Sequence, residues 1–228
     1  LFRSCTFGVT MLDVKIIEDN QLQFLPSAVV NGSFLTHFKN GDIITTSESN
    51  NHTARLYYMV KGRAKVIFLS QEGQTNLIQF LKPNDWIGEL EFLTTENTSK
   101  QVIAIGDTTC ITIPNVLVNQ YLLTNVDYLK NMNQYLTRKL LERTDMMIVG
   151  QSYPFKFRLA SFILADTYRG EYSEPHAVVM AYLGISYRHL LNTYQQFETA
   201  QLLIKVGRNR YQVNTAKLKQ LAGKAISR

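Results

Sequence analysis

The sequence predicts an α+β protein built from three consecutive parts. Short apolar runs separated by turn signals fill the first half, an unbroken helical pattern follows, and helical segments around a small hairpin fill the last third. With 228 residues, 45% of them hydrophobic and 18% charged, the chain has the composition of a folded protein. We expect a jelly-roll-like β-roll over residues 1–114, a long helix over 115–149 and a winged helix-turn-helix domain over 150–228.

The β-rich part is defined by its turns. The run LYYMVKGRAKVIFL has two strand-like halves around Gly62, and TNLIQFL follows the turn signal QEGQ. Further turn signals stand in FKNGDII and LKPNDWIG, and VIAIGDTTCITIP ends at Pro114. Many short strands at this spacing are typical of a β-barrel or sandwich. Cys110 lies in one of these runs and is expected to be a small buried hydrophobe.

The stretch from Asn115 to Val149 contains no Gly or Pro and has apolar residues near heptad spacing. An apolar seam along so long a helix predicts a partner helix, from a second copy of the chain, because an exposed seam would be costly. The alternative is that the stripe packs on the protein's own barrel. The seam residues are Leu122, Val126, Leu129, Asn133, Leu136 and Leu140.

The basic charge is concentrated in the last third of the chain. Residues 151–228 contain 11 Lys and Arg against 4 Asp and Glu, whereas residues 1–150 contain 13 against 14. This segment also contains YLGISYRHLLNTYQQF, in which Gly184 separates two helical patterns and Ser186 is a good N-cap for the second. The pattern predicts a helix-turn-helix, with Leu183, Ile185, Leu190, Leu191 and Tyr194 packing inward.

Three polar residues near the start of the second helix suit a DNA-reading role. Arg188 can bind guanine with two hydrogen bonds, Asn192 can do the same for adenine, and Tyr187 can bind phosphate or stack. The hairpin QLLIKVGRNRYQV follows, with Arg208 and Arg210 placed like a basic wing against the DNA backbone. His189 is expected to lie on a solvated face.

This order of parts resembles the CRP/FNR family of bacterial transcription regulators over nearly the whole chain, and within it the YeiL type. LYYMVKGRAKV is similar to a hairpin of the family, WIGELEFL to its effector-pocket motif, and YLGISYRHLL followed by LLIK to the YeiL type. The resemblance implies that Ser186, Tyr187, Arg188 and Asn192 contact the operator. They differ from the family's usual set, so an unusual operator is expected. Met180 stands where Ala or Gly is usual.

The resemblance also implies an effector pocket in the β-roll. Its candidate residues are Gly88, Glu89, Leu90, Ser99 and Lys100. Glu89 matches the family glutamate that meets a cyclic nucleotide, but Ser99, Lys100 and Gln101 provide no Arg for the phosphate. We therefore expect an effector other than cyclic AMP. Alternatively, Glu89 only hydrogen-bonds the turn after Gly88.

Taken together, the sequence predicts a cytoplasmic, homodimeric regulator that binds double-stranded DNA at a palindromic operator, with RNA polymerase as a further partner if it activates. No catalytic motif, metal site or cofactor site is recognisable, and no apolar run is long enough to cross a membrane. The alternative is a β-roll ligand-binding or interaction module whose C-terminal domain no longer reads DNA, a reading that Met180 favours.

Overall fold

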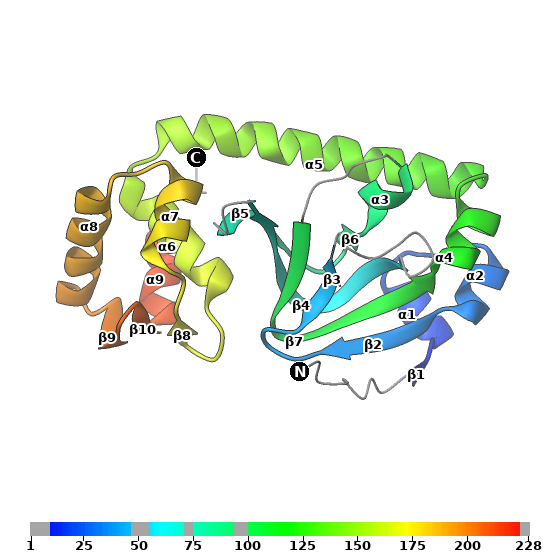
Figure 1. The fold of residues 1–228 in the computed structure, drawn as a ribbon, viewed down its shortest axis with the longest axis horizontal. Helices are drawn as coiled ribbons and strands as arrows, with labels where there is room; N and C mark the ends of the chain where they lie inside the picture. The colour runs from blue at the N-terminus through cyan, green and yellow to red at the C-terminus, as the bar shows by residue number, and fades with distance from the viewer. Residues whose placement is uncertain (1–9, 47–54, 71–74, 94–99, 224–228) are drawn as a thin grey trace. The chain divides into compact units, whose positions relative to one another are not determined.

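The computed structural model describes residues 10–46, 55–70, 75–93 and 100–223. The chain forms two compact units, the first from residues 1–69 and 81–139 and the second from residues 70–80 and 140–228. Figure 1 draws the elements of both units.

An antiparallel β-sheet dominates the first part of the chain. Its strands follow the order β1-β2-β7-β4-β5, with β3 added to β7 and β6 added to β4. The strands are β1 (Thr10–Met11), β2 (Phe34–Phe38), β3 (Ile43–Thr46), β4 (Arg55–Leu69), β5 (Thr75–Leu81), β6 (Trp86–Ile87) and β7 (Lys100–Pro114). The long pair β4 and β7 runs from Arg55 opposite Pro114 to Phe68 opposite Lys100.

Gly62 explains how the long strand β4 passes β7 at its irregular centre. The register shifts on both sides of Lys61, and Gly62 has a φ of +98°. A Cβ atom at this position would lie 2.6 Å from Thr108 Cα. Only glycine meets both the left-handed backbone and the close approach of β7.

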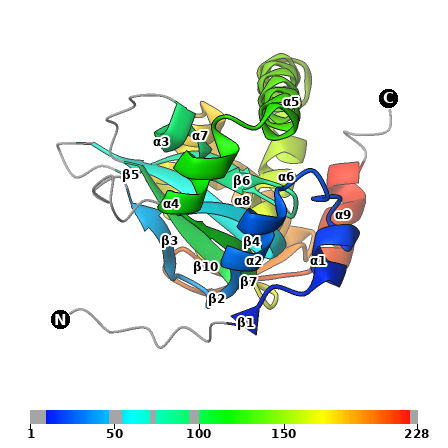
Figure 2. The ribbon, with the colours of Figure 1, turned by 90° about the vertical axis from the view of Figure 1, so that its right-hand side faces the viewer.

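Short helices flank this sheet. They are α1 (Val14–Asp19), α2 (Ser27–Gly32), α3 (Glu89–Leu93), α4 (Asn115–Leu117) and the π-helical turn η1 (Val118–Leu122). Figure 2 shows α1 and α2 beside each other, and Ile17, Leu22, Leu25 and Val29 from this region join the same core as Tyr58 and Trp86. The buried Cys110 also lies in this unit, as expected, with no exposed surface.

The helix expected over residues 115–149 begins later than the sequence pattern indicated. Two short helical segments and a turn precede α5 (Val126–Ser152). The Asn125 side chain ends the turn, because its Oδ1 accepts a hydrogen bond of 2.8 Å from the Tyr128 backbone N–H. Asn is among the best N-cap residues, so it starts a new helix here. Leu122, expected in the exposed seam, is instead fully buried in the core of the first unit.

Helix α5 has an inward and an outward side. Tyr128, Met132 and Tyr135 are buried and lie three and four residues apart, so they share one face. Of the other expected seam residues, Val126 is 76% exposed, Leu129 37% and Leu140 65%. Asn133 is also exposed, whereas Leu136 is half-buried and packs against the core of the first unit. An apolar stripe therefore remains on the surface of the chain. Within the described residues, no helix is both long and apolar enough to span a membrane.

The second unit contains helices around a three-stranded sheet of order β8-β10-β9. Its elements are α6 (Phe155–Asp166), β8 (Glu171–Tyr172), α7 (His176–Leu183), α8 (Tyr187–Thr199), β9 (Leu203–Gly207), β10 (Arg210–Val213) and α9 (Thr215–Gly223). The Tyr194 ring of α8 stacks on Tyr211 of β10 with 4.9 Å between centroids, and the Tyr194 and Tyr172 hydroxyls lie 3.0 Å apart. These buried rings attach the hairpin to α8.

Candidate nucleic-acid interface and effector region

The turn between α7 and α8 has the geometry that its sequence predicts. Gly184 ends α7 in the left-handed conformation, with a φ of +63°. The Ile185 N–H donates to the Met180 carbonyl oxygen at 3.1 Å, which is the six-to-one hydrogen bond of a Schellman C-cap. Ser186 then caps α8, since its Oγ accepts from the His189 N–H at 3.4 Å. Both helix ends are thus fixed by local hydrogen bonds.

Helix α8 presents a polar face to solvent. Leu190, Tyr194 and Phe197 are buried on its inner side. Arg188 and Asn192 are exposed and lie one turn apart on the outer side, and Tyr187 at the first turn is 53% exposed. Leu191 was expected to pack inward, but its side chain is 38% exposed, because it points between the buried and the exposed face of α8.

The outer face extends further along α8 than the sequence analysis proposed. Gln195 follows Arg188 by seven residues, so it lies on the same face, and it is exposed. A surface hollow runs along this side of the helix, lined by Asn192, Gln195, Gln196, Thr199 and Ala200. The seven-residue spacing from Arg188 is visible in the sequence and could have identified Gln195.

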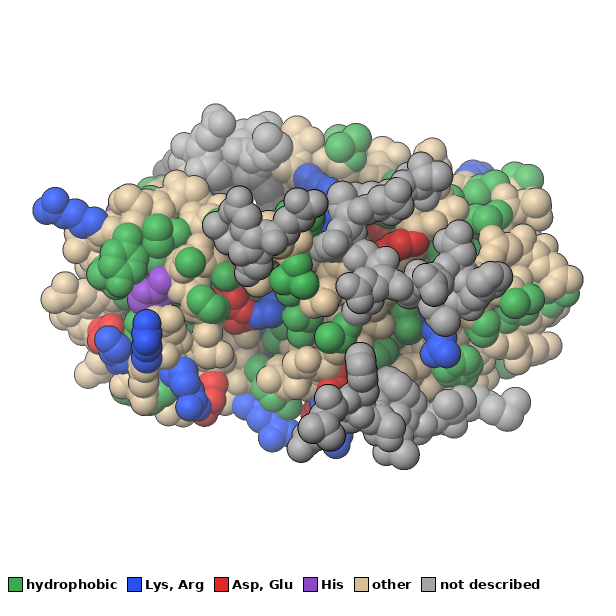
Figure 3. Space-filling view, in the orientation of Figure 1, with side chains coloured by type: hydrophobic (Ala, Val, Ile, Leu, Met, Phe, Trp, Pro, Cys, Tyr) green, Lys and Arg blue, Asp and Glu red, His purple; other side chains and the backbone are tan. Residues whose placement is uncertain are grey.

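The hairpin β9–β10 presents basic side chains of the same unit. Arg208 in its turn and Arg210 at the start of β10 are both exposed. Arg210 Nη2 lies 3.4 Å from Glu171 Oε2, and both side chains are more than 60% exposed, so this ion pair is weak. Figure 3 shows Lys and Arg side chains over α8 and the three-stranded sheet, with acidic side chains among them.

His189 has a packing partner of its own. Its ring lies edge-on to Phe155, with 4.9 Å between the centroids. The residue is still exposed, which agrees with its expected place on a solvated face.

In the first unit, the turn before α3 places the candidate effector residues. Gly88 has a φ of +89°, and a Cβ there would lie 2.7 Å from the Arg55 carbonyl oxygen. Glu89 and Leu90 open α3 and are half-buried, and Lys100 stands opposite Phe68 at the start of β7. Ser99 lies outside the described residues.

The carboxyl group of Glu89 is largely removed from water. Burial raises its pKa to about 7, although its own backbone N–H favours the charged form by hydrogen bonding. The negative charges of Glu91 and Asp85 raise the pKa of Glu89 further, whereas the positive charge of Lys139 lowers it. Lys139 Nζ binds Asp85 Oδ1 at 3.0 Å, and the Tyr135 hydroxyl donates toward the same oxygen at 3.5 Å. Glu89 therefore borders a small polar cluster formed by Asp85, Tyr135 and Lys139. Its hydrogen bond with its own backbone N–H agrees with the alternative that Glu89 only hydrogen-bonds the turn after Gly88.

Known proteins resemble this chain in both sequence and fold. Residues 35–125 match the family model of the cyclic nucleotide-binding domain. Regulatory protein YeiL of Escherichia coli O157:H7 is 32% identical over 192 residues, covering 84% of this chain and 85% of that protein.

Solved structures match most of the chain in fold at lower sequence identity. A transcriptional regulator of the CRP/FNR family from Thermus thermophilus has a TM-score of 0.59 at 18% identity, covering 83% of this chain and 98% of its own. A second CRP-family regulator from the same organism has a TM-score of 0.56 at 16% identity, covering 82% and 96%. Together with the similarity to YeiL, this fold establishes that the chain belongs to the CRP/FNR family, in the group of YeiL.

Proposed function

We propose that the chain is a transcription regulator that binds double-stranded DNA as a homodimer, with α8 in the major groove. Arg188 and Asn192 contact base edges, and Tyr187 contacts a phosphate or stacks on a base. Ser186 fixes the start of the helix against the DNA backbone. Arg208 and Arg210 of the hairpin contact phosphates. The similarity to a YeiL regulatory protein and to CRP/FNR transcriptional regulators supports this role.

The observation that carries the proposal is the exposed polar face of α8. Arg188, Asn192 and Gln195 point away from the buried Leu190 and Tyr194, so a DNA groove could approach them without disturbing the core. Their guanidinium and amide groups are those that form paired hydrogen bonds with guanine and adenine. The net charge of residues 151–228 provides the nonspecific attraction to phosphates.

Dimerisation would proceed through the exposed stripe of α5. Val126, Leu129, Leu136 and Leu140 follow one another at heptad-like spacing, and Asn133 lies between them where a polar seam residue sets register. A two-fold dimer places its recognition helices roughly 34 Å apart, one turn of B-DNA. The operator is then a palindrome. RNA polymerase is a further partner if the protein activates transcription.

Selection of binding sites from random duplex DNA tests the proposal. We expect enrichment of a palindrome whose half-sites are centred about ten base pairs apart. The same selection with Arg188→Ala is expected to lose the preference at one base pair in each half-site and to keep the others.

Lys219→Ala is the matched control, because it removes one exposed positive charge from α9 of the same unit. Its selected sequence should equal that of the unmodified protein. Failure of the unmodified protein to enrich any sequence would contradict the proposal and support an interaction module that does not read DNA.

Cyclic AMP is not part of this proposal. Lys100 can meet a phosphate only as a point charge, whereas Arg would hold it with two parallel hydrogen bonds. A small-molecule effector beside Glu89 in the β-roll would therefore differ from cyclic AMP. Native mass spectrometry of the purified protein would detect such a ligand as an added mass.

A further inference from the structure

A polar cavity that Glu89 does not line lies in the first unit. It has a volume of about 280 Å³ and is bounded by residues 19–24, the turn at Asn84–Trp86 and helix α5. We propose that this cavity binds a small monoanionic ligand with one planar ring and a carboxylate. The proposal does not depend on DNA binding.

The cavity and the seam use different faces of α5. Asn131, Gln134 and Arg138 line the cavity at spacings of three and four residues. The seam residues Leu129, which is exposed, and Leu136, which is half-buried, are displaced from them around the helix axis by roughly half a turn, at about 100° per residue. A second copy docked on the seam would therefore leave the cavity mouth open. Glu89, Leu90 and Lys100 are absent from its lining, so it is distinct from the effector region.

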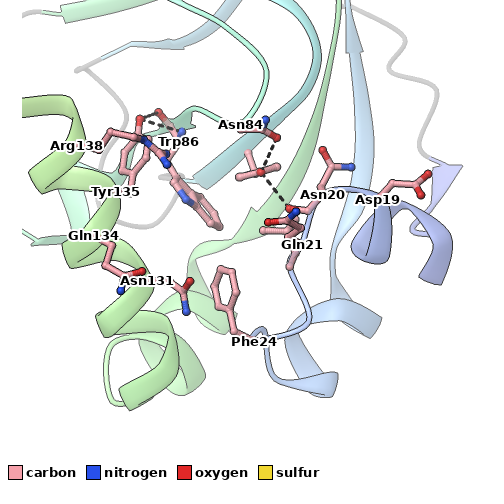
Figure 4. A pocket seen from close by; sticks show the side chains of 12 residues that line it. Asp19, Asn20, Gln21, Phe24, Asn84, Trp86, Asn131, Gln134, Tyr135 and Arg138 are labelled. Carbon is pink, nitrogen blue, oxygen red and sulfur yellow. Dashed lines mark hydrogen bonds between the residues drawn. The ribbon is translucent and has the colours of Figure 1, made fainter. Parts of the chain in front are cut away.

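Aromatic rings form one part of the wall. Trp86, Tyr58 and Phe24 all line the cavity, and the Tyr58 and Trp86 rings meet edge to face with centroids 4.9 Å apart. Figure 4 shows Trp86 between the side chains of α5 and those of residues 19–24. Such a wall favours a flat ring, which can pack against the aromatic faces and edges.

Amide groups supply the hydrogen bonds. The Tyr58 hydroxyl donates to Asn84 Oδ1 at 2.9 Å and lies 3.3 Å from the Asn20 carbonyl oxygen, which orients the Asn84 amide. Among the described residues, no hydrogen bond uses the side-chain nitrogen of Asn84 or the side-chain amide of Gln134. These groups remain available to a ligand.

Arg138 gives the cavity its preference for an anion. Its guanidinium carbon lies 5.7 Å from the centre of the Tyr135 ring, and it has no carboxylate within 4.0 Å in the described part of the chain. Among the described residues that line the cavity, it is the only Lys or Arg, and Asp19 is the only acid. Figure 4 draws these two residues at opposite ends of the cavity. A ligand with one carboxylate can pair with Arg138 at one end of the cavity. The second negative charge of a dianion would instead be repelled by the Asp19 carboxylate at the other end.

Two residues that line the cavity have an uncommon, left-handed backbone conformation. Gln21 has a φ of +55° and Asn84 a φ of +72°, and both residues line the cavity. Residues other than glycine seldom adopt this conformation, and such strain is concentrated at ligand sites. Hydrogen bonds hold both turns, from the Gln21 N–H to the Glu18 oxygen at 3.1 Å and from the Asn84 N–H to the Met59 oxygen at 2.8 Å.

Fluorescence of the protein reports directly on this cavity, because Trp86 is the single tryptophan of the chain. The probes are benzoate and nicotinate, each compared with its neutral analogue, benzamide or nicotinamide. We expect saturable changes in Trp86 emission with the two carboxylates and at least about tenfold weaker binding of the two amides, as one charge-assisted hydrogen bond implies. N-acetyltryptophanamide measured in parallel corrects for light absorbed by the probes.

Variants on one helix then assign the carboxylate to Arg138. Arg138→Gln should weaken benzoate binding about tenfold and leave benzamide binding unchanged. Lys130→Gln, an exposed residue of α5 outside the cavity, removes the same charge and should change neither. Equal binding of carboxylate and amide by the unmodified protein, no saturation up to about 10 mM, or unchanged benzoate binding by a folded Arg138→Gln variant would each overturn the proposal. The comparison of benzoate with benzamide needs no variant, so it decides even if Arg138→Gln fails to fold.

Discussion

Burial of the Glu89 carboxyl group makes the stability of the first unit depend on pH. Its pKa rises to about 7 in the folded chain, so the folded state holds a proton between pH 4.5 and 7 that the unfolded chain has released. Stability therefore falls as the pH rises through this window and then levels off. Glu89→Gln should be more stable than the unmodified protein at pH 7.5, by about 3 kcal/mol, with little difference at pH 4.

Urea unfolding at several pH values and one protein concentration measures this effect. Glu18→Gln, which changes an exposed carboxyl on α1, serves as the control and should keep the original pH dependence. An unchanged pH profile for Glu89→Gln would show that its carboxyl group is solvated, against the burial described above.

The ion pair between Glu171 and Arg210 would compete with the proposed DNA contact of the Arg210 guanidinium. Both groups are highly exposed, so the pair itself adds little to folding. Glu171→Gln removes a negative charge next to the proposed phosphate contact and should strengthen DNA binding about threefold at low salt, with a smaller effect at high salt. Fluorescence anisotropy with a labelled duplex measures it. Weaker binding by this variant would mean that Glu171 orients Arg210 for the DNA.

At the level of elements, two glycines with positive φ differ in what surrounds them. A Cβ at Gly184 meets nothing within 4 Å, so Gly184→Ala adds only the strain of a left-handed alanine, about 1 kcal/mol. Gly62→Ala adds the same strain and also a clash 2.6 Å from the β7 backbone. Thermal unfolding should give a clearly larger loss of stability for Gly62→Ala. Equal losses would contradict the close approach of β4 and β7.

The elements also show what the sequence could and could not predict. The cap residues Gly184 and Ser186 determine α7 and α8 locally, and the turn residues at 207–209 determine the hairpin, so these elements stand where the sequence placed them. The start of α5 was missed because a heptad-like stripe continues backward to Leu122, while the actual boundary is a single side-chain bond from Asn125. Apolar periodicity alone does not show which face of a helix a core covers.

Sites that depend on distant segments were beyond the sequence. The polar cavity beside Trp86 brings together residues 19–24, Asn84–Trp86 and one face of α5, and no local pattern links these stretches. The electrostatic surroundings of Glu89 likewise include Lys139 of α5, which lies fifty residues further along the chain. The outer face of α8 was predictable because it follows from helical spacing within thirteen residues.

At the level of the whole molecule, the exposed stripe of α5 predicts a dimer. Leu129→Glu would place two like charges in an apolar seam and should convert the protein to monomers that keep their helix content. Lys130→Glu on the outer side of the same helix is the control and should remain dimeric. Sedimentation equilibrium distinguishes the two states. A dimer that persists in Leu129→Glu would place the interface elsewhere.

The claim that α8 reads DNA is tested most directly by measuring the affinity of three proteins for the selected duplex and a scrambled duplex. The unmodified protein should prefer the selected duplex, and Arg188→Ala should lose about 1–3 kcal/mol on it per half-site contact, with little change on the scrambled one. Lys219→Ala should keep the preference. If Arg188→Ala retained the full preference for the selected duplex, the assignment of α8 as the reading helix would be wrong.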